Sequence, residues 1–187
     1  MNLFLIGYRG TGKTTIGKKI ASKLNLQFID LDELIVKNAG KTIPEIFAQE
    51  GEPKFREYET NALKQVCKEN YSSKENLQKN GTNPINASKV ISCGGGIITK
   101  EENIELLKKH GFVVLLKAPP EIIFNRIYGD KNRPALTNKD PMAEIKHMLE
   151  VRREMYEKAK NIELWTHNQD IEKCAKKIIE EYAARTH

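Results

Sequence analysis

Apolar residues along this chain fall into short blocks, separated by longer segments in which they recur with a helical period. Leu3-Phe4-Leu5-Ile6 is a continuous apolar run of strand length, and Ile16, Ile20 and Leu24 follow at the spacing of one helix face. This alternation of short apolar runs and segments with helical spacing continues to the C-terminal end. Strands are predicted over residues 2–6, 27–30, 89–92, 113–117 and 162–165. Helices are predicted over residues 13–24, 32–38, 43–50, 53–69, 101–109, 120–128, 142–158 and 171–184.

Short apolar strands that alternate with helices are typical of a parallel sheet covered on both faces. We therefore predict an α/β fold with three layers, α/β/α, around a five-stranded parallel sheet. The length suits one domain over residues 1–187. Two segments break the rhythm. Residues 70–88 are rich in Asn, Ser, Lys and Gly and are predicted to be a flexible surface insertion. Residues 129–141 contain two prolines and mixed charge and are predicted to be a mobile lid.

Composition narrows the class of protein. Hydrophobic residues make up 39% and charged residues 30%, as in a globular protein, and no apolar run has the length of a membrane span. The N-terminal apolar stretch is too short for a signal peptide. Cys67, Cys93 and Cys174 have neither disulfide nor zinc spacing, which favours a cytoplasmic location. The net charge of +6 admits nucleic-acid binding, but lysines on amphipathic helices favour solvated faces and small anionic substrates. We expect no nucleic-acid or membrane partner.

Residues 7–14, GYRGTGKT, match the phosphate-binding loop G-x-x-x-x-G-K-[ST]. The motif lies between a predicted strand and a predicted helix, the context in which backbone N–H groups and the helix N-terminus surround phosphate oxygens. Lys13 is expected to reach the outer phosphates, and the Thr14 hydroxyl to bind Mg²⁺. The sequence therefore predicts a site for ATP. Its predicted residues are Gly10, Thr11, Gly12, Lys13, Thr14 and Thr15.

Two carboxylates follow the second predicted strand, as Asp30-Leu31-Asp32. Ligands of open α/β sheets bind at the carboxyl ends of strands. One carboxylate there can hold a metal ion through water, and the other can accept a proton from an attacking hydroxyl or orient it. The alternative is that Asp32 caps the following helix. The spacing leaves both interpretations open.

Three further signals follow, of which the glycine run favours a ligand site over a plain turn, while the arginine signals are weak when taken singly. Arg56 and Glu59 are three residues apart, close enough to pair on one helix face. Gly94–Gly96 follow a strand and permit a close approach of the backbone to a ligand. Arg133 in the predicted lid and Arg152 on a late helix offer planar recognition of carboxylate or phosphate.

In this order, the signals make the chain resemble the shikimate kinase family of nucleoside-monophosphate-kinase-like P-loop proteins. The resemblance covers nearly the whole chain. Its marks are Gly7–Thr14, Asp30 and Asp32, Phe55-Arg56-x-x-Glu59, Gly94–Gly96, Arg133-Pro134 and Arg152-x-x-x-Tyr156. It implies an ATP-dependent phosphorylation of the 3-hydroxyl of shikimate. The products are shikimate 3-phosphate and ADP, a step of chorismate and aromatic amino acid biosynthesis.

The resemblance also implies roles at the acceptor side of the site. Asp32 would hydrogen-bond the shikimate hydroxyls and assist the attacking one. Arg56 and Arg152 would bind the shikimate carboxylate, with Glu59 orienting Arg56. Gly94, Gly95 and Gly96 would form a wall beside the ring, and Phe47 and Phe55 would line the pocket.

At the donor side, the resemblance implies that Lys13 bridges the β- and γ-phosphates. Asp30 would bind Mg²⁺ through water, Arg126 would pack against adenine, and Arg133 would contact both the transferred phosphate and the acceptor. The implied catalytic residues are thus Lys13, Asp32 and Arg133. Three features depart from the family pattern: Cys93 before the glycines, Ala135 in the lid and the long 70–88 segment. None removes a charged group that the chemistry needs.

Two alternatives stay open on the sequence alone. One is another small-molecule kinase of this fold, for gluconate or a nucleoside monophosphate. The other is a nucleotide-binding protein without catalysis. The joint presence of Lys13, Asp32, Arg56, Arg133 and Arg152 favours the shikimate kinase, which we expect to act as a monomer.

Overall fold

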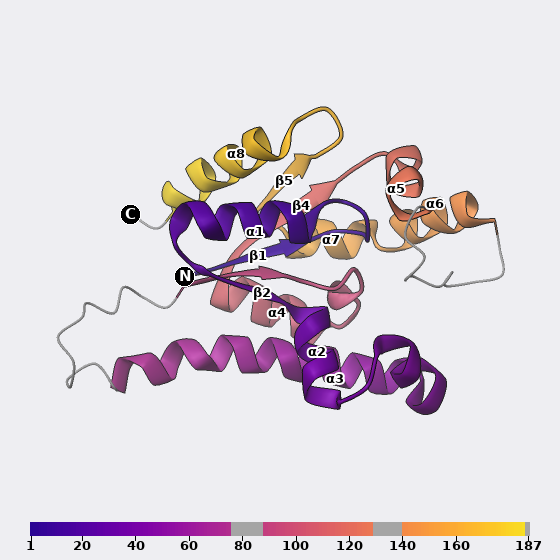
Figure 1. Cartoon of the computed structure of the whole chain (residues 1–187), viewed down its shortest axis with the longest axis horizontal. Helices are drawn as coiled ribbons and strands as arrows, with labels where there is room; N and C mark the ends of the chain where they lie inside the picture. The colour runs from indigo at the N-terminus through magenta and orange to yellow at the C-terminus, as the bar shows by residue number, and fades with distance from the viewer. Residues whose placement is uncertain (76–87, 129–139, 186–187) are drawn as a thin grey trace.

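A single parallel sheet organises the chain. The computed structural model describes residues 1–75, 88–128 and 140–185 (Figure 1). Its strands are ordered β2-β3-β1-β4-β5, and each neighbouring pair is parallel. This arrangement confirms the predicted α/β fold. The strands are β1 (Asn2–Ile6), β2 (Gln27–Asp30), β3 (Lys89–Ser92), β4 (Gly111–Lys117) and β5 (Ile162–Trp165).

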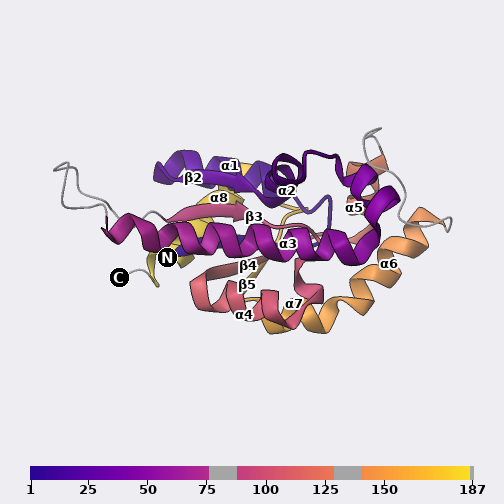
Figure 2. The same ribbon diagram turned by 90° about the horizontal axis from the view of Figure 1, so that it is seen from below.

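Helices cover both faces of the sheet because its inner strands are apolar on both sides. In β1, Leu3 and Leu5 pack toward α1 (Lys13–Leu24) and α8 (Ile171–Ala183). Phe4 and Ile6 point the opposite way, as alternation along a strand requires. The helices on that face are α2 (Leu31–Ala39), α3 (Ile43–Glu75), α4 (Glu101–His110) and α7 (Arg153–Ala159). Figure 2 shows α3 running along the molecule beside α4.

A smaller apolar cluster lies beyond the carboxyl ends of the strands. It joins α5 (Pro120–Tyr128) and α6 (Pro141–Val151) to Tyr8 of the phosphate loop through Ile123 and Ile145. A short 3₁₀ helix, η1 (Ile97–Thr99), follows the glycines after β3. The apolar cluster of α5, α6 and Tyr8 packs against the phosphate loop and supports it.

The largest differences from the predicted elements concern α3 and the α6–α7 segment. The helices expected over 43–50 and 53–69 form one continuous element, α3, with a break in helical geometry at Gly51 (φ 79°, ψ 170°). It runs on to Glu75, where an insertion was expected from residue 70, because no glycine or proline interrupts the chain there. The single helix expected over 142–158 divides at Arg152 into α6 and α7. The remainder of the predicted insertion, 76–87, and most of the predicted lid, 129–139, lie outside the described residues.

Of the helices that the structure describes, none combines the length and apolar character needed to cross a membrane. The longest, α3, has 33 residues and many charged side chains.

Candidate active site

Three loops meet at the carboxyl edge of the sheet because β3 lies between β2 and β1. They are the phosphate loop after β1, the Asp30–Asp32 segment after β2 and the glycine loop, Gly94–Gly96, after β3. A cavity of about 590 Å³ opens between them. The predicted site residues that line it are Gly10, Thr11, Gly12, Lys13, Thr14, Thr15, Asp30, Asp32, Gly94, Gly95 and Arg126.

The phosphate loop adopts a conformation that needs glycine. Gly10 and Gly12 have φ values of 80° and 95°, and a Cβ on Gly7 would lie 2.3 Å from the Leu116 carbonyl oxygen. The Lys13 side chain folds back over the loop, where its ammonium donates to the carbonyl oxygens of Gly7 at 2.8 Å and Tyr8 at 3.0 Å. Only 8% of Lys13 is exposed. The ammonium is therefore held at the phosphate end of the cavity.

A cluster of hard oxygen atoms lies beside the loop. The Thr14 hydroxyl donates to Asp30 Oδ2 at 2.9 Å and lies 3.4 Å from Ser92 Oγ. Oxygen donors of this kind are those that Mg²⁺ prefers. Within the described ranges no group of three His, Cys, Asp or Glu side chains has metal-binding geometry. A magnesium ion here would thus depend on hydroxyl and phosphate oxygens as well as Asp30.

The two carboxylates of the Asp30–Asp32 segment have different surroundings. Asp30 Oδ1 accepts a hydrogen bond of 3.0 Å from the Asp32 backbone N–H, so Asp30 is the N-cap of α2. The capping alternative considered for Asp32 is wrong, because the helix begins one residue earlier than expected. Asp32 Oδ1 instead lies beside Gly94, 2.9 Å from the place where a Cβ would stand.

Glu59 of α3 reaches the same glycine from the other side. Its Oε1 is also 2.9 Å from the position of a Gly94 Cβ, so Asp32 and Glu59 converge on that glycine. Glu59 is 1% exposed, and burial raises its pKa against the opposing effect of the Arg56 charge. A side chain at position 94 would separate the two carboxylates from the backbone that they approach.

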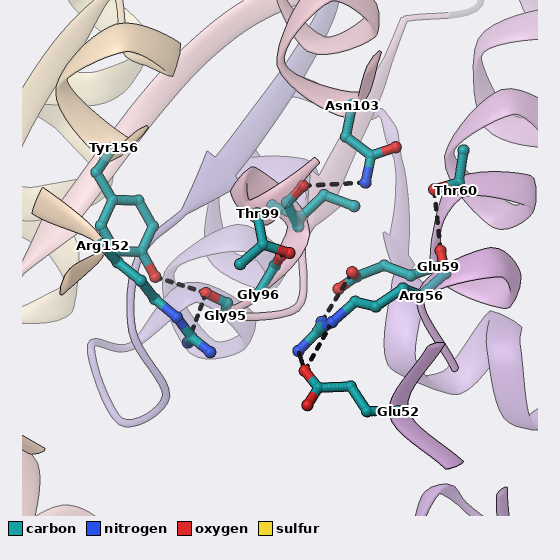
Figure 3. Close-up of polar contacts among 11 residues, drawn as sticks. Glu52, Arg56, Glu59, Thr60, Gly95, Gly96, Thr99, Asn103, Arg152 and Tyr156 are labelled. Carbon is teal, nitrogen blue, oxygen red and sulfur yellow. Dashed lines mark hydrogen bonds and ion pairs between the residues drawn. The ribbon is translucent and has the colours of Figure 1, made fainter. Parts of the chain in front are cut away.

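Arg56 is clamped between two glutamates, as Figure 3 shows. Its Nη1 donates to Glu59 Oε2 at 2.9 Å, while Nε and Nη2 donate to Glu52 Oε1 at 3.2 and 2.9 Å. The predicted pairing with Glu59 is confirmed, and Glu52, one helical turn earlier, is an additional partner that the sequence reasoning missed. The guanidinium lies directly on Gly96, where a Cβ would stand 2.2 Å from Nη1.

Gly96→Ala is expected to displace Arg56 and to raise KM for a carboxylate substrate by about tenfold, the effect of weakening one charged hydrogen bond. The backbone of Gly96 (φ −103°, ψ 2°) accepts alanine, so the clash falls on the guanidinium alone. Steady-state kinetics of Gly96→Ala, Arg56→Ala and the double variant test this. Additive effects of the two substitutions would contradict it, because both should remove one interaction.

Arg152 lies where α6 gives way to α7, and it points to the glycine loop. Its Nη1 donates to the Gly95 carbonyl oxygen at 3.0 Å, and the Tyr156 hydroxyl donates to the same oxygen at 2.7 Å (Figure 3). Arg152 is 8% exposed, and its Cζ is 6.0 Å from the centroid of the Tyr8 ring. Arg56 and Arg152 therefore flank the glycine loop from two separate helical segments. Sequence reasoning gave Tyr156 no function, although its i, i+4 spacing from Arg152 could have suggested one.

Arg126 closes the other end of the cavity. Its Nη1 donates to the Gly10 carbonyl oxygen at 3.1 Å and to Thr166 Oγ1 at 3.2 Å, and Nη2 donates to the Thr166 carbonyl oxygen at 3.2 Å. Thr166 in turn donates to the Thr11 carbonyl oxygen at 3.0 Å. Thr166 had no motif to reveal it, and only its place directly after β5 points to this edge. Arg133 and Ala135 lie outside the described residues.

Cys93 lines the cavity but is only 1% exposed, and burial raises the pKa of its thiol well above the ordinary value. The two predicted pocket aromatics, Phe47 and Phe55, pack together with ring centroids 4.8 Å apart. Both belong to or pack against the core between α3 and the sheet.

We expect ATP and shikimate together to slow alkylation of Cys93 by iodoacetamide at least threefold, because bound ligands would cover the cavity wall that it helps to form. Cys67 is the internal control: it is also buried, with a pKa raised to about 11, but it does not line the cavity. Mass spectrometry of the labelled peptides measures both rates. An unchanged Cys93 rate would place the thiol away from bound substrates.

Comparisons with known proteins agree with this geometry. A family model described as shikimate kinase matches residues 9–183. The shikimate kinase of Thermodesulfovibrio yellowstonii is 38% identical over 181 residues, which cover 97% of this chain and 94% of the relative. A structure of the Acinetobacter baumannii shikimate kinase in complex with shikimate has a TM-score of 0.83 at 33% identity, covering 98% of this chain and 93% of that one. The Bacteroides thetaiotaomicron shikimate kinase has a TM-score of 0.80 at 34% identity, with coverage of 96% and 97%. This chain therefore belongs to the shikimate kinase family.

Proposed function

We propose that this chain transfers the γ-phosphoryl group of ATP to the 3-hydroxyl of shikimate, giving ADP and shikimate 3-phosphate. One observation carries the proposal: the phosphate loop and the glycine loop line one cavity, and two arginines and two carboxylates converge on the glycine loop. The first loop suits a polyphosphate donor, and the second suits a small hydroxylated acid.

The acceptor would lie against Gly94–Gly96. Arg56 and Arg152 approach this loop from α3 and from the junction of α6 and α7. Two guanidinium groups can hold one carboxylate through charged hydrogen bonds and so orient the ring. Asp32, at Gly94, would then accept a hydrogen bond from the hydroxyl that reacts. An acceptor without a carboxylate would leave these arginines without their ligand.

The transfer step exchanges one bond to phosphorus for another. The oxygen of the 3-hydroxyl attacks the γ-phosphorus, and the bond from that phosphorus to the β–γ bridging oxygen breaks. Its electron pair stays on ADP, and the hydroxyl proton passes to Asp32. Such transfers need mainly positioning and neutralisation of charge. Lys13 would supply a positive charge at the β- and γ-phosphates, from the loop that now holds its ammonium.

Thr14 and, through water, Asp30 would hold Mg²⁺, and the oxygen cluster that these two form with Ser92 fits such an ion. When bound, magnesium neutralises phosphate charge. Arg126 would pack against the adenine ring at the far end of the cavity, which it lines. Arg133 is proposed, on the family resemblance alone, to contact the transferred phosphate.

We also propose that the chain acts as a single-domain monomer in the cytoplasm, without nucleic acid. The described cavity is built from one chain, and all three cysteines are buried free thiols, as a reducing compartment allows. Sedimentation at micromolar concentration tests the monomer. Salt-sensitive binding of an oligonucleotide would contradict the proposal that the chain acts without nucleic acid.

A coupled assay of ADP release with a panel of acceptors tests the function. We expect turnover with shikimate and at least 100-fold lower kcat/KM with gluconate or a nucleoside monophosphate, since these lack the matching arrangement of carboxylate and hydroxyls. Equal turnover with gluconate would support the other small-molecule kinase. Nucleotide binding with no turnover on any acceptor would support a non-catalytic protein.

A further inference from the structure

Arg9 of the phosphate loop lies where that loop passes the glycine loop. It lines the cavity together with Lys13 and Asp32. Its backbone nitrogen is 3.4 Å from where a Cβ of Gly95 would lie, so the phosphate loop passes the glycine loop at this residue. A phosphoryl group that moves from ATP on the phosphate loop to an acceptor on the glycine loop would pass near this contact between the two loops.

The Arg9 side chain is held by an acidic residue from a distant element. Nη2 of Arg9 is 3.1 Å from Glu144 Oε1, across 135 positions of sequence. Glu144 lies in the first turn of α6, and its side chain is 4% exposed. The guanidinium also lies over the Tyr8 ring, with Cζ 5.7 Å from the centroid, while Arg152 lies 6.0 Å from the same ring. Arg9 and Arg152 therefore both lie within cation–π distance of the same ring.

A buried ion pair of this kind adds little net stability, because desolvation of both charges offsets their attraction. The effect of the Glu144 pairing is to fix the position of the Arg9 guanidinium. Without Glu144, the long Arg9 side chain would sample many rotamers. With Glu144, a planar cation is held beside the Tyr8 ring, on a residue that lines the cavity together with Lys13.

We propose that Arg9 is an additional phosphate-binding residue that contacts the phosphoryl group on its arrival at the acceptor, and that Glu144 is its positioning residue. The inference rests on the proposed function, because it concerns the group that this reaction transfers. Planar guanidinium groups bind phosphate oxygens through paired hydrogen bonds. A cation here would stabilise the phosphorylated product more than the unphosphorylated acceptor.

The test is titration calorimetry with shikimate and with shikimate 3-phosphate. Arg9→Met is expected to weaken binding of shikimate 3-phosphate about 30-fold, the loss of a charged hydrogen bond, and that of shikimate less than threefold. Arg9→Lys, which retains the charge, should recover most of the product affinity. Glu144→Gln should weaken product binding about fivefold in the wild-type background and have no further effect in Arg9→Met.

Glu101→Gln is the matched control, since Glu101 also lies in the first turn of a helix and pairs with a cation on another element, Lys158, at 2.6 Å. Its product affinity should stay within twofold of wild type. Wild-type product affinity in Arg9→Met, or equal effects of Glu144→Gln in both backgrounds, would overturn the inference. If wild-type protein released no ADP with shikimate, the proposed function itself would fail. If Arg9→Met did not fold, the product affinities of Arg9→Lys and Glu144→Gln would be compared with that of wild type instead.

Discussion

Asp32→Asn is expected to lower kcat for shikimate phosphorylation by about 10³-fold, within the range that general-base residues contribute. Asparagine has nearly the same shape as aspartate, and it can still hydrogen-bond a hydroxyl, but it cannot take up the proton. The ATP phosphates bind at the phosphate loop, so KM for ATP should change less than threefold. Initial rates of ADP release at saturating shikimate measure the first effect, and calorimetry with a non-hydrolysable ATP analogue measures the second.

Glu33→Gln is the matched control for Asp32→Asn. Glu33 is the next residue, it is exposed, and both acids lie in the first turn of α2 near the positive end of the helix dipole. Loss of charge in that turn is therefore common to the two variants, whereas proton transfer is assigned to Asp32 alone. Near wild-type turnover in Asp32→Asn, or an equal loss in both variants, would remove Asp32 from the proposed mechanism.

Arg152→Ala is expected to raise KM for shikimate about 100-fold and KM for ATP less than threefold, because it removes a buried guanidinium that would bind the carboxylate through charged hydrogen bonds. The same substitution also removes the bond of Arg152 to the Gly95 carbonyl oxygen. For that reason the melting temperature should be measured beside the kinetics. Arg152→Lys keeps the charge but not the paired geometry, and an intermediate KM is expected.

Arg153→Ala provides the control for this second prediction. Arg153 is the adjacent arginine, but its side chain is two-thirds exposed and pairs with Glu150. Its substitution should leave both KM values within twofold. An equal rise of the two KM values in Arg152→Ala would indicate a general disturbance of the site and argue against a carboxylate clamp.

Much of the architecture was predictable because its signals are local. The run Leu3–Ile6 and the helical spacing of Ile16 and Ile20 marked β1 and α1, and four of the five strands have the predicted bounds. β4 begins two residues earlier than expected, at Gly111, where pairing with Asn2 extends the strand. That extension depends on a partner strand and has no local signature.

In the site, too, contacts between residues close in sequence were predictable, and contacts between distant residues were not. The spacing of Arg56 and Glu59 on one helix predicted their pairing, and the glycines of the phosphate loop predicted its shape. The pairing of Arg9 with Glu144 has no such signal, because 135 positions separate the partners. The capping of α2 by Asp30 depended on a helix boundary, which local patterns place only to within a few residues.

The fold class, the phosphate loop and the charged residues available for chemistry can all be read from the order of amino acids. These properties follow from periodicity and spacing within single elements. Which of these charges lie next to one another depends on how the helices and strands pack. The strand order β2-β3-β1 brings Asp32 to Gly94, and the break between α6 and α7 turns Arg152 toward Gly95. Such convergence follows from the packing of whole elements against one another, and no short stretch of the chain encodes it.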